Sequence, residues 1–244
     1  MDSKKLTAPL KKILPFQFKK FSVNHDRCSN KVGTDAVLLG SWVDIHQVRT
    51  ILDVGTGSGV IALMLAQRTD GDVHIDAIEL EKEEASQAKE NVLRSPWPNK
   101  ISVVEKSIQA FNPDIKYDLM VSNPPFFTNS LLPPSVHRVR TRHTEQLTHH
   151  ELIDHAIRLI NPSGTLAVIL PVAEGNNFKQ LIFKKGWQVK RQLAFYSRKE
   201  KPQERWLFEF GIHPNPPQEE KLVLHKTGNL KSNDYIKLTE DFYL

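Results

Sequence analysis

The sequence has very few of the residues that stabilise secreted proteins or bind structural metals. Cys28 is the one cysteine among 244 residues, which excludes an intrachain disulfide and a multi-cysteine metal site. The longest apolar run, Val60–Ala66, is too short to cross a bilayer. No charged start leads into a long apolar segment, so no signal peptide is indicated. We therefore expect a cytoplasmic protein with no membrane association.

Histidine is more frequent, but its spacing does not favour metal binding. His149 and His150 are adjacent, and no pair of histidines four residues apart brackets an acidic residue. We expect the ten histidines to be core or surface side chains and the protein to bind no metal. Aromatic residues make up only 8% of the chain and are sparse among the basic ones, so an appended RNA-binding module is not indicated.

The chain is moderately basic, with a net charge of +5 and a pI of about 9.2. This balance suits a polyanionic partner, although an ordinary basic enzyme has the same balance. Two stretches, 137–143 and 198–205, concentrate the charge, and arginine binds phosphate in a bidentate manner. The candidate RNA-binding residues are Arg138, Arg140, Arg142, Arg198, Lys199 and Lys201. A solvated surface is the alternative, above all at 198–205, where Glu200 and Glu204 offset the charge.

A rigid loop follows the apolar run Tyr117–Ser122, which we interpret as a buried strand. The tetrapeptide Asn123-Pro124-Pro125-Phe126 stops both strand and helix, because proline lacks an N–H group and fixes φ. Open α/β sheets place their active sites at the carboxyl ends of strands. An amide, a proline carbonyl and an aromatic ring suit a planar amino group, which needs two acceptors and a stacking face. An ordinary Asn-Pro turn is the alternative.

A glycine loop lies earlier in the chain, within Ile51–Val60. Gly55, Gly57 and Gly59 let the backbone approach a ligand closely, and the following helix offers free N–H groups. A dinucleotide fingerprint would need its third glycine at position 60, which is valine. Asp53, just before the loop, suits a cationic ligand better than a pyrophosphate.

A second acidic residue, Glu79, ends the next expected strand, 73–79. A carboxylate at that place can accept both hydroxyl groups of a ribose, as in nucleoside cofactors generally. An acid that stabilises the start of the following helix is the alternative interpretation.

These motifs, in this order and at these separations, resemble class I S-adenosylmethionine-dependent methyltransferases that act on amino groups conjugated to a ring or an amide. Phe18–Cys28 and Lys31–Trp42 look like the N-terminal signature of the bacterial tRNA1(Val) adenine-N6-methyltransferases. The segments Ala62–Thr69 and Asp241–Leu244 fit as well. The resemblance runs from about residue 16 to the C-terminus.

The resemblance implies methylation of the N6 amino group of the anticodon-loop adenine 37 in tRNA1(Val), with S-adenosyl-L-methionine as cofactor and a monomeric enzyme. The implied catalytic residues are Asn123, Pro124, Pro125 and Phe126, with Asn123 Oδ1 and the Pro124 carbonyl accepting the amino protons and Phe126 stacking on the flipped base. The implied cofactor-binding residues are Lys31, Thr34, Asp35, Asp53, Gly55, Gly57, Gly59, Glu79, Ser107, Ile108 and Asn123.

Two positions depart from the family pattern. Ser107 stands near the end of the third strand, where adenine-N6 enzymes usually carry aspartate. Phe126 is shared with guanine-N2 rRNA methyltransferases, which are one alternative. A protein glutamine-N5 methyltransferase is a second, disfavoured because only about 50 residues precede the glycine loop. An RNA chaperone that binds the cofactor without catalysis is disfavoured by the intact Asn-Pro-Pro-Phe loop.

The expected architecture is an α/β, Rossmann-like class I methyltransferase fold. Its mainly parallel seven-stranded sheet would carry a C-terminal antiparallel hairpin and helices on both faces. We expect strands at about 50–54, 73–79, 101–105, 117–122, 164–170, 187–196 and 205–213. We expect helices at about 34–43, 59–68, 81–94, 148–160 and 174–184, and a short hairpin at 16–23. Residues 1–15 would form a basic tail and 16–244 a single domain.

Overall fold

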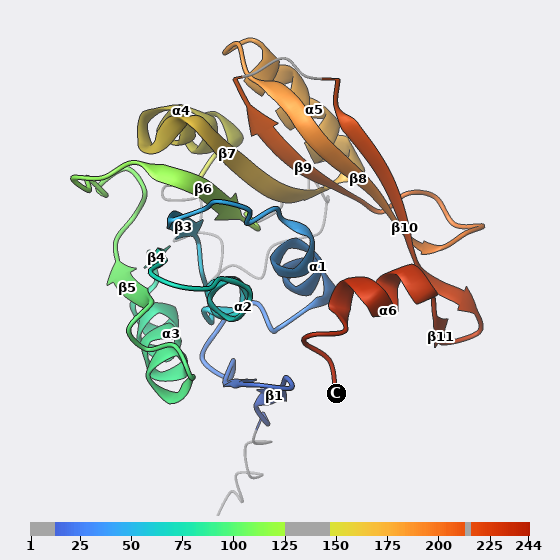
Figure 1. Cartoon of the computed structure of the whole chain (residues 1–244), viewed down its shortest axis with the longest axis horizontal. Helices are drawn as coiled ribbons and strands as arrows, with labels where there is room; N and C mark the ends of the chain where they lie inside the picture. The colour runs from blue at the N-terminus through green and yellow to red at the C-terminus, as the bar shows by residue number, and fades with distance from the viewer. Residues whose placement is uncertain (1–12, 125–146, 213–215) are drawn as a thin grey trace, which may run out of the picture.

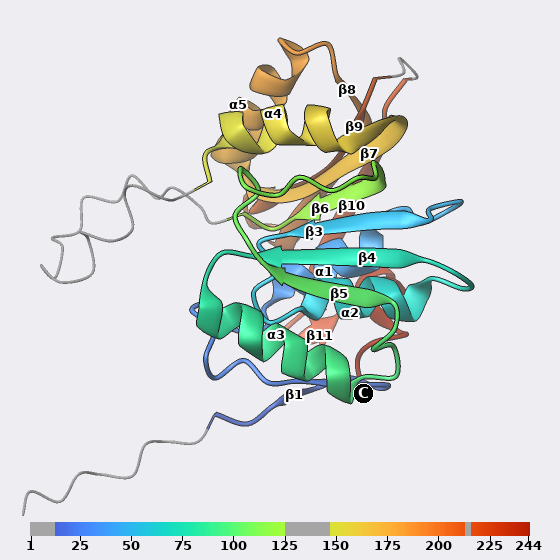
Figure 2. The same cartoon turned by 90° about the vertical axis from the view of Figure 1, so that its left-hand side faces the viewer.

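The computed structural model describes residues 13–124, 147–212 and 216–244, and its central element is a mixed β-sheet (Figure 1). Within these ranges the sheet has nine strands in the order β11-β10-β8-β9-β7-β6-β3-β4-β5. The strands are β3 (Thr50–Val54), β4 (His74–Glu79), β5 (Ile101–Glu105), β6 (Tyr117–Ser122), β7 (Ile160–Pro171), β8 (Gln188–Arg198), β9 (Arg205–Gly211), β10 (Gln218–Thr227) and β11 (Leu230–Lys231). Figure 2 shows β6, β3, β4 and β5 lying side by side.

Helices cover both faces of the sheet because its parallel strands are apolar on both sides. Successive strand residues point to opposite faces, so Ile51 packs in one core cluster and its neighbour Leu52 in the other. The first cluster includes residues of α1 (Thr34–Trp42), α2 (Val60–Arg68), α3 (Lys82–Arg94) and α6 (Asn233–Thr239). The second includes residues of α4 (His149–Leu159) and α5 (Val172–Phe183).

The expected α/β architecture, a mainly parallel sheet with helices on both faces, is confirmed, with one difference in the sheet. The antiparallel pair β8–β9 is present as expected, but the sheet has nine strands among the described residues rather than seven. The additional strands are β10 and β11. β10 begins with Gln218 and the charged residues Glu219, Glu220 and Lys221, so its sequence lacks the alternation that predicts a strand. It forms because β8 offers an unpaired edge, with which β10 pairs in parallel.

The two edges of the sheet differ in what they carry. β3, β4, β5, β6 and β7 are parallel, so their carboxyl ends meet at one edge, here called the carboxyl edge. The turn between β8 and β9 lies at this edge too, because Arg205 pairs with both Pro171 and Phe195. The opposite edge, here called the amino edge, holds the beginnings of the parallel strands.

The two ends of the described chain meet beside the sheet. Residues 16–23 form the expected hairpin from β1 (Phe16–Gln17) and β2 (Ser22–Val23). The Lys19 N–H donates to the Phe242 carbonyl at 2.8 Å, and Phe18 packs edge-on against the Phe242 ring. None of the described helices is long and apolar enough to cross a membrane.

Candidate active site

The register of the sheet brings the predicted site residues together. Val54 of β3 pairs with Ile78 of β4 on one side and with Ser122 of β6 on the other. The glycine loop, Glu79 and Asn123 therefore lie level with one another at the carboxyl edge, at the ends of neighbouring strands about 4.8 Å apart. This juxtaposition is the one expected from the sequence.

The glycine loop between β3 and α2 leaves room for a ligand. φ is +69° at Gly55, +55° at Gly57 and +82° at Gly59, values that side-chain-bearing residues rarely adopt. A Cβ atom built on Gly55 would meet nothing within 4 Å, so the space above it is open. A Cβ atom on Gly59 would lie 3.4 Å from the Ala88 Cβ atom of α3. At Gly59 a Cβ atom would make only an ordinary contact with α3, so the positive φ is what favours glycine there, whereas Gly55 also borders open space.

Asp53, near the end of β3, is a fully buried acid with one unused acceptor. Its Oδ2 accepts from the Thr56 hydroxyl at 2.6 Å and from the Ala62 N–H at 3.2 Å. Its Oδ1 is buried and has no hydrogen-bond partner among the described residues. Burial raises the pKa of Asp53 to about 7, while the two hydrogen bonds act in the opposite direction. A cationic ligand that donates to Oδ1 would favour the ionised form.

Glu79 holds the glycine loop in place. Its Oε2 accepts from the Gly57 N–H at 2.8 Å, and its Oε1 accepts from the N–H groups of Leu80 and Glu81 at 2.8 and 3.1 Å. Burial raises the pKa of Glu79, against the effect of these hydrogen bonds. Because a carboxylate oxygen has two lone pairs, Oε2 keeps acceptor capacity for a ligand hydroxyl group.

Asn123 presents an unpaired acceptor at the end of β6. The Ser122 hydroxyl donates to the Val54 carbonyl at 2.9 Å, which ties this strand end to β3. Asn123 Oδ1 is buried and has no partner among the described residues. Such an atom is costly unless something binds it. Pro124 is buried, whereas Pro125 and Phe126 lie outside the described residues.

Ser107 and Ile108 follow β5 at the same edge. The Lys106 N–H donates to the Glu79 carbonyl at 2.9 Å, which brings this segment beside the end of β4. Ser107 Oγ accepts from the Ala110 N–H at 3.3 Å, and Ile108 is buried in the core. One acceptor position of Ser107 Oγ is therefore occupied within its own turn.

The N-terminal candidates have partners within the protein. The Lys31 ammonium group donates to the carbonyls of His25 and Cys28 at 2.7 and 3.0 Å. Asp35, in the first turn of α1, forms an ion pair with Arg205 at 2.9 Å. Thr34 is exposed at the start of α1. Lys31 therefore stabilises its own loop, and Asp35 links α1 to the start of β9.

The candidate RNA-binding residues fall into a described and an undescribed group. The side chains of Lys199 and Lys201 are exposed in the β8–β9 turn on the carboxyl edge. Arg198 donates to the Gly228 carbonyl at 2.6 Å and so joins this turn to the β10–β11 turn. Arg138, Arg140 and Arg142 lie outside the described residues.

Comparison with known proteins identifies the family. A family model described as methyltransferase small domain matches residues 28–185. A tRNA1(Val) (adenine(37)-N6)-methyltransferase of Tolumonas auensis is 42% identical over 229 residues, covering 94% of this chain and 96% of the relative. A protein of the same name from Bacteroides fragilis is 42% identical over 232 residues, covering 94% and 97%. The chain belongs to this methyltransferase family.

Solved structures agree with the methyltransferase fold. A predicted O-methyltransferase from Agrobacterium tumefaciens has a TM-score of 0.62 at 18% identity, covering 85% of this chain and 96% of that protein. A glycopeptide N-methyltransferase solved with S-adenosyl-L-methionine has a TM-score of 0.55 at 11% identity, covering 75% and 100%. At these identities the likeness concerns the fold alone.

Two residues that support the site of this methyltransferase were not found from sequence patterns. Gln87 and Asn91 lie on α3 and are each 1% exposed, although both are polar. Both hydrogen-bond to the segment that precedes α1. Their spacing of four residues on one helical face was the available signal, but polar residues on a charged helix do not by themselves indicate burial.

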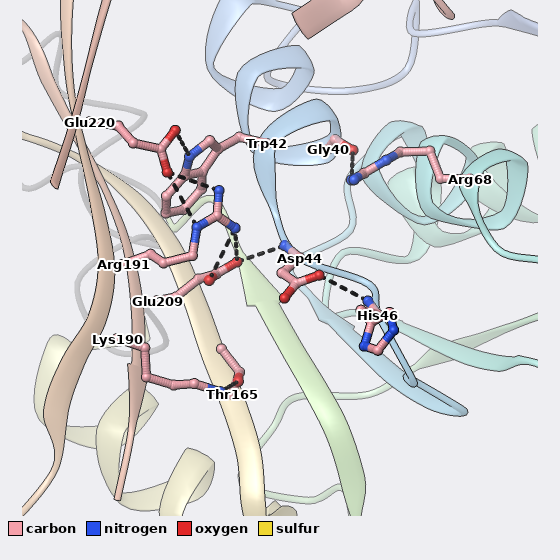
Figure 3. Close-up of polar contacts among 10 residues, drawn as sticks. All are labelled: Gly40, Trp42, Asp44, His46, Arg68, Thr165, Lys190, Arg191, Glu209 and Glu220. Carbon is pink, nitrogen blue, oxygen red and sulfur yellow. Dashed lines mark hydrogen bonds and ion pairs between the residues drawn. The ribbon is translucent and has the colours of Figure 1, made fainter. Parts of the chain in front are cut away.

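A second polar cluster of the methyltransferase lies toward the amino edge (Figure 3). The Arg191 guanidinium group lies 4.5 Å from the centre of the Trp42 ring and forms ion pairs with Glu209 and Glu220. Glu209 also accepts from the Asp44 N–H at 2.7 Å, and Glu220 accepts from Trp42 Nε1 at 3.3 Å. The charged groups of this cluster satisfy one another. Among the described residues, no group of three potential ligand side chains is placed to hold a metal ion.

Proposed function

We propose that this protein transfers a methyl group from S-adenosyl-L-methionine to the N6 amino group of adenine 37 in tRNA1(Val). The relatives that carry this name match 94% of the chain. The observation that carries the proposal is the buried Oδ1 of Asn123, which has no partner in the part of the chain that the structure describes and lies beside the glycine loop and Glu79. The guanine-N2 and glutamine-N5 alternatives are not favoured, because these relatives are named as adenine enzymes.

The carboxyl edge fits the proposed cofactor. The unpaired Asp53 Oδ1 suits a positively charged amino group, and the open space above Gly55 suits a ligand that lies against the loop. Glu79 Oε2 has capacity for a ribose hydroxyl group. Lys31, Thr34, Asp35, Ser107 and Ile108 would form the surrounding wall. When bound, S-adenosyl-L-methionine supplies the electrophilic methyl group.

We assign to the chain the role of orienting the N6 amino group of the adenine. The lone pair of an adenine amino nitrogen is delocalised into the ring, so this nitrogen is a poor nucleophile. Asn123 Oδ1 and the Pro124 carbonyl would each accept one amino proton, which favours a tetrahedral nitrogen with a free lone pair. Their dipoles also stabilise the positive charge that develops on the nitrogen. No strong base is needed, because the alkylated nitrogen loses its proton to water.

Adenine is distinguished from guanine by the neighbouring ring nitrogen. Asn123 and Pro124 only accept, so they fit the amino group of either base. Adenine N1 is an acceptor and guanine N1 a donor, so a protein donor beside this atom would select adenine. We assign this role to the segment Phe127–Asn129, and stacking to Phe126, all outside the described residues. An anticodon-loop base is already unpaired, which lowers the cost of flipping it.

The tRNA would lie along the carboxyl edge. Lys199 and Lys201 are exposed there, with Arg198 beside them. Arg138, Arg140 and Arg142 would add phosphate contacts next to the catalytic loop. We further propose that residues 16–244 act as one domain, that the enzyme acts as a monomer and that it works in the cytoplasm, where tRNA is found.

Nucleoside mass spectrometry tests the proposal. tRNA from a strain lacking this enzyme is incubated with the protein and methyl-labelled S-adenosyl-L-methionine, then digested. The expected product is N6-methyladenosine, absent when adenine 37 of tRNA1(Val) is replaced by guanine. Label in N2-methylguanosine, or label in ribosomal RNA but not in tRNA, would overturn the substrate assignment.

A further inference from the structure

The segment Asn24–Val32, here called the strap, runs between β2 and α1 and is fastened to one face of α3. The anchoring positions on α3 are three and four residues apart, so they share a helical face. The backbone N–H groups of Asn24, Arg27 and Ser29 donate to the side chains of Asn91, Gln87 and Glu84, at 2.9, 3.0 and 3.0 Å. The strap therefore depends on side chains of α3 for its position.

The strap is also cross-linked internally. Lys31 donates to the carbonyls of His25 and Cys28, and the Val32 N–H donates to His25 Nδ1 at 2.9 Å. These bonds connect the two ends of the strap, so a displacement of Asn24 is transmitted toward the start of α1. The strap thus behaves as one unit that leads directly to the proposed cofactor residues.

Asn91 joins the strap to the glycine loop. Its Nδ2 donates to the Asn24 carbonyl at 2.8 Å and to the Ser58 carbonyl at 2.9 Å, while its Oδ1 accepts from the Asn24 N–H. Ser58 lies between Gly57 and Gly59 of the loop. The side chain is only 1% exposed, so water cannot replace a partner that moves away.

We propose that Asn91 is a positioning residue that couples the cofactor-binding glycine loop to the strap. The inference rests on the proposed cofactor. A ligand that packs against the loop selects the loop conformation in which the Ser58 carbonyl faces Asn91. The planar amide then holds Asn24 at a fixed distance from that carbonyl, because its two N–H groups diverge at a fixed angle. Cofactor binding would thereby order the strap and the start of α1.

Gln87 provides a matched control on the same helix. It is as deeply buried as Asn91 and also makes three hydrogen bonds, to the Arg27 N–H, the Cys28 thiol and Asp26 Oδ1. All three partners belong to the strap. Replacing Gln87 therefore loosens the strap and keeps the contact to the glycine loop. Replacing Asn91 loosens the strap and also removes that contact.

The experiment combines calorimetry with hydrogen exchange, using S-adenosylhomocysteine as the ligand. In the wild type, ligand binding should slow exchange of the strap amides, residues 24–32. Asn91→Asp keeps the acceptor for the Asn24 N–H and loses both donors. It should bind about tenfold more weakly, a typical effect of losing a buried hydrogen bond. Binding should then no longer protect the strap.

Steady-state kinetics provide a second measurement. Asn91→Asp should raise KM for S-adenosyl-L-methionine about tenfold while kcat at saturating cofactor changes less than threefold, since Asn91 does not contact the reacting group. Gln87→Leu should speed strap exchange in the free protein and weaken ligand binding less than Asn91→Asp does, because the bond from Asn91 to the Ser58 carbonyl is kept. Asn91→Ala, which adds no buried charge, carries the same expectation if Asn91→Asp does not fold.

Equal weakening by Asn91→Asp and Gln87→Leu would show that strap anchoring alone matters and would overturn the coupling. Unchanged affinity and protection in both Asn91 variants would overturn it as well. If the wild type binds ligand but its strap amides show no added protection, the coupling fails and the proposed function stands. If the wild type does not bind S-adenosylhomocysteine, the proposed function fails, and the coupling with it.

Discussion

The two edges of one sheet each hold a buried carboxyl group, Glu209 at the amino edge and Asp53 at the carboxyl edge, in opposite states. At the amino edge, Arg191 is matched by Glu209 and Glu220 and stacks on Trp42. At the carboxyl edge, Asp53 Oδ1 is buried without a partner among the described residues. The first arrangement is complete without a ligand, and the second leaves an acceptor that the proposed ligand would use.

This difference separates groups that stabilise the fold from groups that we propose bind a ligand. Burial alone does not distinguish them, because Glu209 and Asp53 are both buried and burial raises the pKa of each. Hydrogen bonding does distinguish them, because a buried acceptor that the fold leaves unpaired costs free energy that a ligand can recover. Replacements at the carboxyl edge should therefore reduce activity, and replacements at the amino edge should reduce stability.

The largest effect is expected at Asn123. Asn123→Ala should lower kcat by at least about 10²-fold, the usual cost of losing a contact that strengthens in the transition state. Cofactor affinity and the melting temperature should stay near wild type, because Oδ1 has no partner to lose among the described residues. Asn123→Asp keeps an acceptor and should retain more activity than Asn123→Ala. The measurement is single-turnover methyl transfer. If Asn123→Ala keeps more than a tenth of the wild-type rate, Asn123 does not orient the amino group.

The converse effect is expected at Arg191. Arg191→Ala should destabilise the protein by about 3 kcal/mol, because it leaves Glu209 buried and charged. Chemical denaturation measures this free energy, and kcat at a permissive temperature should be unchanged. Lys190→Ala is the control, since Lys190 bonds only the Thr165 hydroxyl among the partners drawn in Figure 3. Equal losses in the two variants would contradict the assigned role of the cluster.

Cofactor affinity should depend on Glu79. Glu79→Ala should weaken S-adenosyl-L-methionine binding by about 1–3 kcal/mol, through the lost ribose contact and the lost hydrogen bond to the Gly57 N–H. Glu105 of β5 pairs in register with Glu79 of β4 but is exposed, so Glu105→Ala is a matched control with the same change of charge. Isothermal calorimetry that gives the two variants the same affinity would exclude Glu79 from the ribose site.

Asp53 should make cofactor binding depend on pH. Its pKa of about 7 lies above the ordinary 3.8, so the folded state favours the protonated acid. Its stabilising contribution is complete below about pH 4 and is lost as the pH rises through 7. A cationic ligand needs the ionised form, so affinity should fall about fivefold from pH 7 to pH 6. In calorimetry, Asp53→Asn should show a weaker dependence of affinity on pH. An equal fall in affinity in the wild type and in Asp53→Asn would assign the pH dependence to another group.

The smallest effect is expected for tRNA docking. Replacing Lys199 and Lys201 with alanine should raise KM for tRNA a few-fold and reduce the salt slope by up to about two units, one per phosphate contact. The control replaces Lys116 and Lys184, which are exposed at the amino edge. Similar salt slopes in the two double variants would show that the β8–β9 turn does not contact tRNA phosphates and is an ordinary solvated surface.

Local patterns predicted most of the fold and the grouping of the glycine loop, Glu79 and Asn123 at one edge of the sheet. β3 and β6 were placed to the residue because each is an apolar run ended by glycine or proline. The partner of Asp35 was not predictable, since Asp35 pairs with Arg205, 170 residues away. β10 was missed because its pairing with β8, rather than its own charged sequence, makes it a strand. Asn91 was missed because its burial follows from tertiary packing.

The most direct test is a crystal structure of the protein with S-adenosylhomocysteine and an anticodon stem-loop that contains adenine 37. We predict that Asn123 Oδ1 lies about 2.9 Å from the adenine N6 atom, a normal hydrogen-bond distance. We also predict that the amino-edge cluster around Arg191 is unchanged. An adenine amino group held by other acceptors, with Asn123 Oδ1 beyond about 3.5 Å, would contradict the assignment of catalysis to the carboxyl edge through Asn123.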